Sequence, residues 1–487
     1  MVRIAVIGGG ISGLAAAHRI RELDPAVEVR LFEASSRLGG VLGTVHEDGY
    51  QVEWSADNFI TTYPWGLALC RRIGLEDELT STCPENRRTL VVRKGRLHAL
   101  PDGFLMMAPT RLWPMALTPL LTIWGKLRAG FEYFIPPRKV NSDESVAAFV
   151  RRRFGREVFE RLVEPLVSGV YAADMERLSL LATLPRFREI EQRYGSLIRG
   201  MQKERALQRR HHRESGARYS MFVTLRNGLE RLIGRLAEAL PPESVRLNHR
   251  VLSLRKLNFG WEVGFHIPTD AGLQDQAEVF DGIILAIPAF EAARLVEPLD
   301  LELSTLLASI RYEGTAILAL AYDRQAVRHP LRGMGCVVPA IEHSPILAVS
   351  FSSQKYLHRA PAGKVLLRVF VGGARHPDLA SRPQEEIEKL VLPELTRLFA
   401  IDGMPEKRWF FPWPRSMPQY DVGHLERVGR IRSLIAKHPG LALAGNAYQG
   451  VGIPHCIHSG ESAAESLLNQ LVSTDKTAGK PAPHPIG

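Results

Sequence analysis

Arg3-Ile-Ala-Val-Ile-Gly-Gly-Gly-Ile-Ser-Gly13 opens this chain and decides its fold. The short apolar run of residues 4–7 predicts a buried parallel strand, and residues 14–20 (Leu-Ala-Ala-Ala-His-Arg-Ile) predict a helix after it. The turn between them carries glycines at the spacing G-x-G-x-x-G, namely Gly8, Gly10 and Gly13. A strand, a glycine-rich turn and a helix in this order are typical of a dinucleotide-binding βαβ unit.

Each glycine of this turn has its own task in such a unit. Gly8 allows the tight turn, Gly10 lets a diphosphate approach the backbone, and Gly13 lets the helix pack closely on the strand. Residues 27–32 predict a second strand, and Glu33 follows it, twenty residues beyond Gly13, where a carboxylate can accept hydrogen bonds from ribose hydroxyls. A turn without a ligand would not explain this combination, so we expect a dinucleotide with its phosphates at the helix N-terminus.

These residues alone do not distinguish NAD from FAD. The next residues, Ser35-Ser-Arg37-Leu-Gly39-Gly40, place a basic residue and a glycine pair directly after the ribose acid. This arrangement suits a second backbone approach to a long cofactor. It therefore favours FAD, whose flavin extends well beyond the first βαβ unit.

Length and composition are typical of a large soluble globular protein. At 487 residues, 45% hydrophobic and 23% charged, the chain should form two or three domains. The net charge of +10 suits an anionic ligand or an acidic membrane surface, and because no nucleic-acid module is recognisable we expect no nucleic-acid partner.

The four cysteines show no metal-ligand or disulfide pattern, so we expect no metal site. No signal peptide precedes the first strand, which predicts a cytoplasmic protein, with a peripheral position on the inner face of the membrane as an alternative.

Residues 101–138 are more apolar than the rest of the chain. Their longest uncharged run, Leu112 to Gly125, has 14 residues, fewer than the roughly 20 that a membrane-spanning helix needs. Two interpretations stay open. The segment could lie on a membrane, with Arg111, Lys126 and Arg128 at the headgroups and its tryptophans at the interface, or it could form a buried helical pair that walls a hydrophobic pocket.

A second glycine-rich turn lies near the end of the chain, in Gly445-Asn-Ala-Tyr-Gln-Gly450-Val-Gly452-Ile-Pro-His-Cys-Ile-His-Ser-Gly460-Glu461. Its backbone N–H groups and the N-terminus of the helix that follows can lie beside the polar edge of a flavin and stabilise charge on the reduced ring. A C-terminal helix without a ligand would not explain why Gly450 and Gly452 flank its approach.

The chain resembles the oxygen-dependent protoporphyrinogen and coproporphyrinogen oxidases, FAD enzymes of the flavin amine oxidase superfamily. The opening turn with Glu33 is shared by the whole superfamily. Other matching motifs cover nearly the whole chain, and the segments around Gly169, Tyr420 and Gly450 are much more specific to porphyrinogen oxidases. The matching segments are residues 37–40, 97–101, 164–174, 178–179 and 222–229, Trp413, Met417-Pro-Gln-Tyr420 with Gly423-His424, and residues 445–461.

The resemblance implies where FAD would bind, and without a covalent link, because no histidyl or cysteinyl flavin-linking motif is evident. Where the family has a Gly-Pro pair this chain has Ser55-Ala56, and His455 stands where an acid or amide is common. The implied FAD contacts are Gly8, Gly9, Gly10, Ile11, Ser12, Gly13, Glu33, Ala34, Arg37, Gly40, Val41, Ser55, Ala56, Asp57, Asn58, Val251 (by its backbone, at the adenine), Trp413, Val451, Gly452 and Ile453.

The resemblance also implies oxidation of a porphyrinogen to the porphyrin in haem biosynthesis. Six electrons would leave in three rounds through the flavin, and O2 would reoxidise the flavin each time and form H2O2. Because the cofactor performs the redox step, we assign no catalytic side chain. Asp57 and His455 are candidates for accepting protons, although solvated turn residues would explain both. Arg88 matches a family position that pairs with a substrate propionate, and Gly169 would line the pocket where no side chain fits beside the macrocycle.

Several alternatives stay open. An amine oxidase or a carotenoid desaturase is a rival that the segments around Gly169 and Tyr448 argue against. A non-catalytic flavoprotein is a more remote rival, because the cofactor motifs at both ends are intact. The sequence does not distinguish protoporphyrinogen IX, with two propionates, from coproporphyrinogen III, with four. Peripheral membrane contact and a homodimer also stay open.

The expected fold class is α/β. We expect a discontinuous Rossmann-like FAD-binding domain (1–85, 220–295 and 436–472), an α+β substrate-binding domain (86–104 and 296–435) and a helical, membrane-associating subdomain (105–219). Residues 203–218 are expected to be an exposed loop or helix end, and residues 473–487 a disordered tail. The predicted hairpins are 44–54 and 89–100; the further strands are 245–254, 261–266, 282–287, 315–322, 346–352, 365–371 and 441–446; the helices are 65–74, 145–154, 158–163, 228–240 and 459–470.

Overall fold

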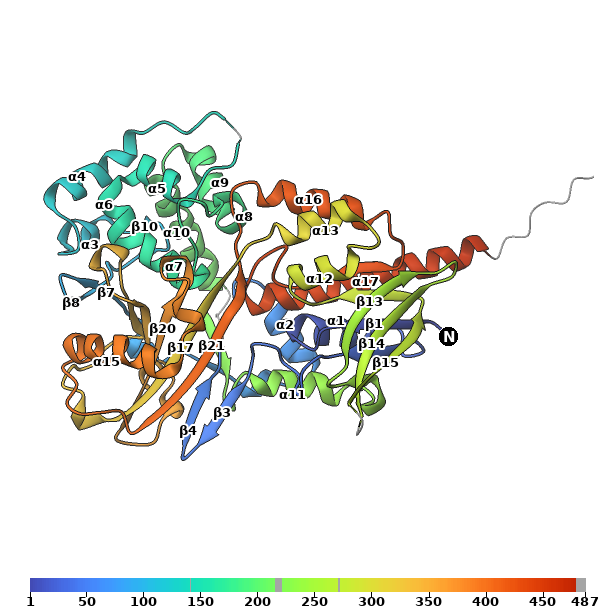
Figure 1. Cartoon of the computed structure of the whole chain (residues 1–487). Helices are drawn as coiled ribbons and strands as arrows, with labels where there is room; N and C mark the ends of the chain where they lie inside the picture. Colours follow the sequence, from blue (N-terminus) through green and yellow to red (C-terminus); the bar gives the residue numbers. More distant parts are fainter. Residues whose placement is uncertain (141, 215–220, 270–271, 479–487) are drawn as a thin grey trace, which may run out of the picture.

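The computed structural model describes residues 1–140, 142–214, 221–269 and 272–478, and of residues 208–214 and 473–478 it describes the backbone only. Figure 1 shows an α/β protein with two large sheets side by side and a layer of helices above one of them.

A five-stranded parallel sheet is built around β1 (Arg3–Ile7). Its order is β12-β2-β1-β16-β22, and each neighbouring pair is parallel. The sheet therefore collects segments from the beginning, the middle and the end of the chain. The other four strands are β2 (Glu28–Phe32), β12 (Val245–Arg246), β16 (Gly282–Leu285) and β22 (Leu441–Leu443).

Both faces of this parallel sheet are covered. Ile4 and Val6 belong to a core that they share with α1 (Ile11–Leu23), α2 (Trp65–Arg72), α11 (Glu230–Glu238) and α17 (Ile453–Ala478). Ala5 and Ile7 belong to the core on the other face. Burial on both faces explains why the strand reads as one continuous apolar run. The second core contains β13 (Arg250–Lys256), β14 (Trp261–Thr269), β15 (Gly272–Phe280), α12 (Ala289–Val296), α13 (Leu301–Ala308) and α16 (His424–Ile435).

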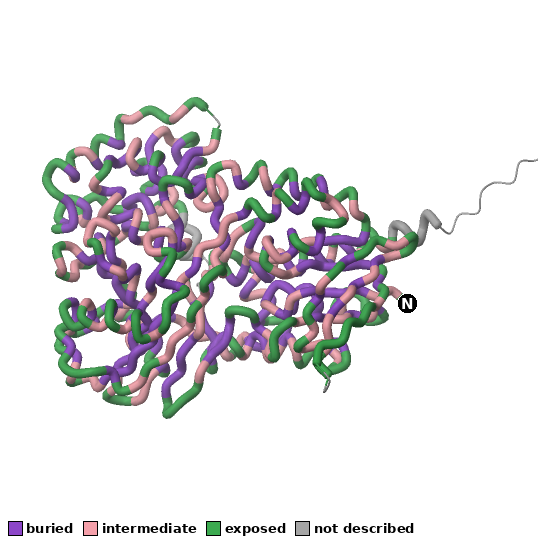
Figure 2. The backbone as a smooth tube through the Cα atoms, in the orientation of Figure 1, coloured by how far each residue is buried: buried purple, intermediate pink, exposed green. Residues whose placement is uncertain are grey.

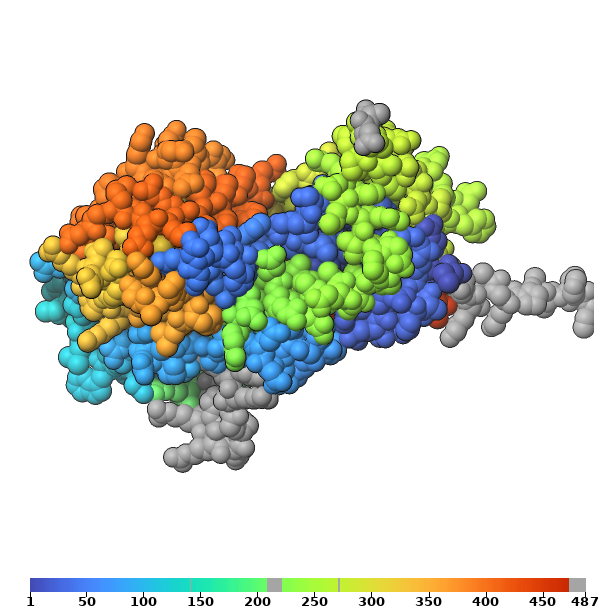
Figure 3. Space-filling model, turned by 90° about the horizontal axis from the view of Figure 1, so that it is seen from below, coloured from blue at the N-terminus to red at the C-terminus, as the bar shows by residue number. Residues whose placement is uncertain are grey.

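A seven-stranded sheet forms the second centre, in the order β21-β17-β20-β19-β18-β7-β8. α15 (Gln384–Phe399) covers one face, and the hairpin of β3 (Thr44–Glu47) and β4 (Tyr50–Glu53) packs on the other. Figure 3 shows this hairpin in blue beside β21 in orange, where Glu47 accepts hydrogen bonds from Lys407 at 2.6 Å and Trp409 at 2.7 Å. The strands are β7 (Thr89–Arg93), β8 (Arg96–Ala99), β17 (Tyr312–Asp323), β18 (Gly335–Val337), β19 (Ile346–Phe351), β20 (Lys364–Gly372) and β21 (Lys407–Pro418).

A layer of helices lies above the seven-stranded sheet (Figure 1) and has its own apolar core. A π-helical turn, η4 (Phe159–Val163), leads into the helix that carries Gly169. The helices are α3 (Leu112–Leu117), α4 (Ile123–Gly130), η3 (Phe131–Phe134), α5 (Val146–Phe154), α6 (Arg156–Val158), α7 (Glu164–Tyr171), α8 (Leu180–Thr183), α9 (Pro185–Tyr194) and α10 (Leu197–Glu214).

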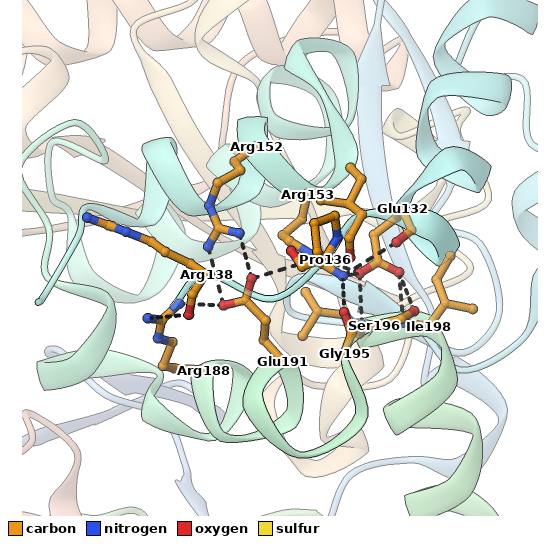
Figure 4. A network of polar contacts seen from close by, with 12 residues as sticks. Glu132, Pro136, Arg138, Arg152, Arg153, Arg188, Glu191, Gly195, Ser196 and Ile198 are labelled. Carbon is orange, nitrogen blue, oxygen red and sulfur yellow. Dashed lines mark hydrogen bonds and ion pairs between the residues drawn. The ribbon is translucent and has the colours of Figure 1, made fainter. Parts of the chain in front are cut away.

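A buried polar network joins these helices (Figure 4). Glu132 of η3 accepts hydrogen bonds from Arg153 Nε at 2.8 Å, Ser196 Oγ at 2.7 Å and the Leu197 N–H at 2.8 Å. Its carboxylate thereby caps α10 and neutralises a fully buried arginine of α5. Glu191 of α9 pairs in turn with Arg152 and Arg188, each at 2.5 Å.

The apolar segment 101–138 exposes many of its large side chains. Its backbone lies at the outer edge of the helical layer, where Figure 2 colours much of the tube as exposed. Trp113 is 78% exposed and Trp124 is 80% exposed, so the interpretation as a buried helical pair that walls a hydrophobic pocket is wrong for these side chains. We call these side chains the α3–η3 patch. No helix among the described residues is long and apolar enough to cross a membrane. The patch consists of Leu112, Trp113, Leu117, Ile123, Trp124, Leu127, Phe131 and Phe134.

One charged residue predicted beside this segment has another role. Arg128 donates to the backbone carbonyls of Arg151, Arg152 and Arg153 at 2.8–3.3 Å. It therefore holds the C-terminal end of α5, where cations stabilise the last carbonyls, and this contact accounts for Arg128 without a membrane headgroup.

Most predicted elements are confirmed, including both hairpins. The predicted strand 245–254 is two strands, because Asn248 has φ +57° and turns the chain from β12 into β13 of another sheet. Residues 203–214 continue α10, whereas 215–220 are outside the described residues. The tail prediction is wrong as far as Ala478, where α17 ends, and residues 479–487 are not described. β21 was not predicted, because its prolines argue against a strand inside a sheet. β21 lies at the edge of the seven-stranded sheet, where prolines are tolerated.

The remaining short strands pair locally. β5 (Phe59–Ile60), β11 (Phe222–Leu225) and β6 (Leu79–Ser81) form a small sheet, and β9 (Phe104–Leu105) pairs with β10 (Ala108–Pro109). The short helix α14 (Ser352–Lys355) follows β19.

Candidate functional site

The opening turn leaves one side of its backbone open. A Cβ on Gly10 would meet nothing within 4 Å, and no side chain of the described residues caps α1 at this position. A Cβ on Gly8 would lie 2.5 Å from the Ala286 carbonyl oxygen, and a Cβ on Gly13 would overlap the Gly8 carbonyl. Gly8 and Gly13 are therefore required by packing, whereas the space over Gly10, at the positive end of α1, fits an approaching diphosphate.

Glu33 stands at the end of β2 and already holds the backbone around the turn. One carboxylate oxygen accepts from the Gly9 N–H, and the other accepts from the Ser35 N–H and hydroxyl, each at 2.8 Å. Each oxygen can accept more than one hydrogen bond, so capacity for a ribose hydroxyl remains. Ala34, next to it, is exposed.

Arg37 organises the loop that follows. Its guanidinium donates to the carbonyls of Leu38 and Leu42 at 2.9 Å and to that of Gly40, and lies 4.0 Å from the centre of the Trp54 ring. The side chain thus holds the loop that presents Gly40 and Val41, both exposed, beside Gly10.

The stretch Ser55 to Asn58, which we call the 55–58 loop, is held by hydrogen bonds to other segments and within itself. Ser55 Oγ donates to the Val41 carbonyl at 2.7 Å, and Trp413 of β21 donates to the Trp54 carbonyl at 3.0 Å. Asn58 donates to Asp57 at 2.6 Å, while Ala56 is exposed. The structure therefore brings together four separately predicted contact regions: the opening turn, Val41, the 55–58 loop and Trp413.

Asp57 is held by one cation of α14 and one cation of β20. Burial would raise the pKa of Asp57, but Lys355, whose Nζ lies 3.0 Å away, and Arg368 outweigh this effect and lower the pKa to about 2. An ion-paired carboxylate of such low basicity is a poor proton acceptor at neutral pH. Sequence reasoning missed Lys355 and Arg368, although an arginine inside the apolar run 365–371 is itself a signal, since lone charges are rarely fully buried.

The helix that follows the closing turn packs against the helix that follows the opening turn. Val451 and Gly452 lead directly into α17, which begins at Ile453, and a Cβ on Gly460 would overlap the Ser12 carbonyl of α1. The start of α1 therefore packs against the N-terminal half of α17, at Gly460. The family motifs support this turn, because the Tyr420 hydroxyl donates to the Asn446 carbonyl at 2.5 Å and the Tyr420 ring stacks on His424.

His455 packs beside Gly450 and the ring of Tyr63, with ring centroids 4.2 Å apart. Burial and the neighbouring His458 lower the pKa of His455. Both effects disfavour the protonated imidazole.

The two predicted substrate contacts lie around β18. Arg88 immediately precedes β7, which pairs with β18, and its guanidinium is exposed, without a hydrogen bond or ion pair to the described residues. Gly169 of α7 is exposed. A Cβ added at Gly169 would have Val337 of β18 as its nearest neighbour, at 3.8 Å. Val251, the predicted adenine contact, lies on β13 and is buried.

Comparison with known proteins agrees with this geometry. The family model described as flavin containing amine oxidoreductase matches residues 11–468. Coproporphyrinogen III oxidase of Bacillus subtilis (strain 168) is 34% identical, with 96% of this chain and 98% of the relative aligned. The chloroplastic protoporphyrinogen oxidase of Nicotiana tabacum is 30% identical over 96% of this chain and 85% of the relative.

A crystal structure from Exiguobacterium sp. 255-15 superimposes with a TM-score of 0.83 at 31% identity, covering 96% of this chain and 99% of the other. The match extends over both sheets and the helical layer. This chain therefore belongs to the flavin-containing amine oxidoreductase family, in the branch that contains coproporphyrinogen III oxidases and protoporphyrinogen oxidases.

Proposed function

We propose that this chain oxidises a porphyrinogen, protoporphyrinogen IX or coproporphyrinogen III, to the porphyrin with non-covalent FAD in haem biosynthesis. The reaction consumes three O2 and releases three H2O2 for each porphyrin formed. The observation that carries the proposal is the open, uncapped backbone at Gly10 beside the loop of Gly40 and Val41 and the 55–58 loop, in a chain whose near full-length relatives are named as porphyrinogen oxidases.

The protein's own contribution is binding and orientation. Bound FAD supplies two-electron chemistry at its ring. The turns at Gly8–Gly13 and Val451–Ile453 hold the two ends of the cofactor, and residues 1–85, 220–295 and 436–472 form its domain. Asp57, which Lys355 and Arg368 hold as a carboxylate of low basicity, is a weak candidate for accepting a proton, and His455 is the other candidate. Residues 86–104 and 296–435 then face the substrate, with Gly169 leaving room for a flat macrocycle.

The direct test supplies both porphyrinogens to the purified holoenzyme in air. We expect porphyrin fluorescence with at least one of them and H2O2 in a ratio of about three per porphyrin. Anaerobic bleaching of the flavin by the porphyrinogen separates an oxidase from a non-catalytic flavoprotein. No porphyrin from either compound would refute the proposal.

Arg88→Ala is expected to raise KM about tenfold and to change kcat much less. A hydrogen bond to a charged group contributes about 1.5–3 kcal/mol net, and the exposed guanidinium of Arg88 is free to bind a propionate bidentately. Arg87→Ala is the matched control, since this neighbouring arginine is also exposed but donates to the Thr82 carbonyl. Steady-state kinetics with a tetracarboxylate and a dicarboxylate porphyrinogen measure the effect, and an unchanged KM contradicts the propionate role.

We also propose that the α3–η3 patch rests on the inner face of the membrane, which makes the protein cytoplasmic and peripheral. Its tryptophans suit the interface, and Arg111 is exposed beside it to meet anionic headgroups. A substrate as apolar as a porphyrinogen would gain from an entrance at the membrane.

The double substitution Trp113→Ser/Trp124→Ser is expected to weaken binding to anionic phospholipid vesicles more than tenfold. Burying a large apolar side chain contributes about 1.5–3 kcal/mol, and both indoles are at least three-quarters exposed. Cosedimentation with vesicles measures binding. Leu301→Ser is the control, because it removes an exposed apolar side chain of α13, outside the α3–η3 patch, and should not change vesicle binding. A double variant that binds as the unaltered protein does would exclude this surface.

A further inference from the structure

Five charged side chains meet between the seven-stranded sheet and the 55–58 loop. Glu53 and Asp57 come from β4 and the loop, whereas Lys355, Arg359 and Arg368 come from α14, the turn after it and β20. Each of these side chains is at most 14% exposed. Three cations thus face two carboxylates, so this charge cluster carries a net charge of +1.

Two of the cations have a carboxylate of their own. Lys355 Nζ lies 3.0 Å and 3.1 Å from the two oxygens of Asp57. Arg359 pairs with Glu53 and also donates to Thr224 Oγ1 at 3.1 Å. Both carboxylates of the cluster therefore already pair with Lys355 or Arg359, and Arg368 has no carboxylate of its own.

Arg368 is the uncompensated member. Its guanidinium donates to the Ser55 carbonyl, and Asp57, which Lys355 already engages, is 3.4 Å away. Its Nε and Nη1 make no hydrogen bond to the described residues, and neither does Ser350 Oγ, which stands opposite it in the register of β19 and β20. Burying such a charge is unfavourable unless it is partnered.

An unbalanced charge acts strongly here because the cluster is shielded from water, and charges interact more strongly where the dielectric constant is low. The cluster lies directly behind the 55–58 loop, which we place at the flavin. Reduction of a flavin adds negative charge to its ring, so a nearby positive charge stabilises the reduced form more than the oxidised form.

We propose that Arg368 is a positioning residue that fixes the 55–58 loop and, through its uncompensated charge, raises the reduction potential of the bound flavin. The inference rests on the placement of FAD in the proposed function. It explains why a fully buried arginine occupies the middle of an otherwise apolar strand.

The test measures the reduction potential of the flavin in the holoenzyme, by equilibration with a reference dye and without substrate. Arg368→Met makes the cluster neutral and should weaken binding of reduced relative to oxidised flavin at least tenfold, which lowers the potential by about 30 mV for a two-electron couple. Asp57→Asn makes the cluster +2 and should shift the potential upward by a similar factor. Arg368→Lys keeps the charge and should stay within threefold of the unaltered protein.

Shifts of opposite sign distinguish an electrostatic effect from a general loss of structure. Arg324→Met is the control, because among the described residues the side chain of this arginine donates only to the Val327 and His329 carbonyls. The reduction potential of the flavin should not change in this variant. If Arg368→Met does not fold, Lys355→Met replaces it, with the same downward shift expected.

Two outcomes overturn the inference: equal potentials in all variants, or shifts of one sign in both Arg368→Met and Asp57→Asn. In either case a yellow, active holoenzyme would leave the proposed function standing. If the purified protein did not bind FAD, or oxidised neither porphyrinogen, the proposed function itself would be refuted.

Discussion

Gly13→Ala is expected to abolish flavin binding, with the FAD dissociation constant raised at least a hundredfold. The added methyl group would overlap the Gly8 carbonyl oxygen and lie 3.3 Å from Ala286 Cβ, so α1 would have to move away from β1. That movement disturbs the open backbone at Gly10 where the diphosphate would bind. Overpacking of this kind also costs about 1–3 kcal/mol of unfolding free energy. Flavin absorbance per protein and urea unfolding measure the two effects.

Gly234→Ala is the matched control for this substitution. Gly234 is also a helical glycine, in α11, but a Cβ there meets nothing within 4 Å. Alanine is favoured over glycine in a helix by about 1 kcal/mol, so this variant should keep its flavin and gain stability. A Gly13→Ala protein that binds FAD normally would show that the cofactor does not use this turn.

Glu132→Ala is expected to destabilise the protein by about 3–5 kcal/mol, because it leaves the buried Arg153 without its main counter-ion. The substitution also removes the carboxylate that accepts the Leu197 and Ile198 N–H groups and thereby caps α10. Both members of the pair are fully buried in the network of Figure 4, so water cannot replace the lost contacts. Urea unfolding followed by circular dichroism measures the change.

Glu176→Ala provides the comparison on the surface. Glu176 pairs with Arg151 of α5, but its side chain is 53% exposed. Exposed ion pairs typically contribute no more than about 1 kcal/mol, so this variant should unfold nearly as the unaltered protein does. A Glu132→Ala protein with equal stability would contradict the importance of the buried network.

The parallel sheet was predictable because each of its signals is local. The strand of residues 4–7, the glycine spacing and Glu33 lie within one short stretch, and the physical requirement of each is a backbone conformation or a close approach between neighbours. The charge cluster was not predictable in this way, because Ser55 and Arg368 are 313 residues apart. Nothing near either residue indicates that they meet.

The apolar segment 101–138 also separates what the sequence predicts from what only the tertiary structure decides. Its composition excluded a membrane span but left burial and exposure open. Only the packing of α3, α4 and η3 decided that the tryptophans face outward and that Arg128 faces the end of α5.

By itself, the sequence determined the dinucleotide turn, the second glycine turn and the family, because these depend on residue types at fixed short spacings. The tertiary structure decided that the helices after the two turns pack together, that Asp57 is held by Lys355 and Arg368, and which apolar side chains are exposed. These properties arise from contacts between distant segments, and their energies depend on burial. Burial is a property of the folded chain and not of any single stretch of it.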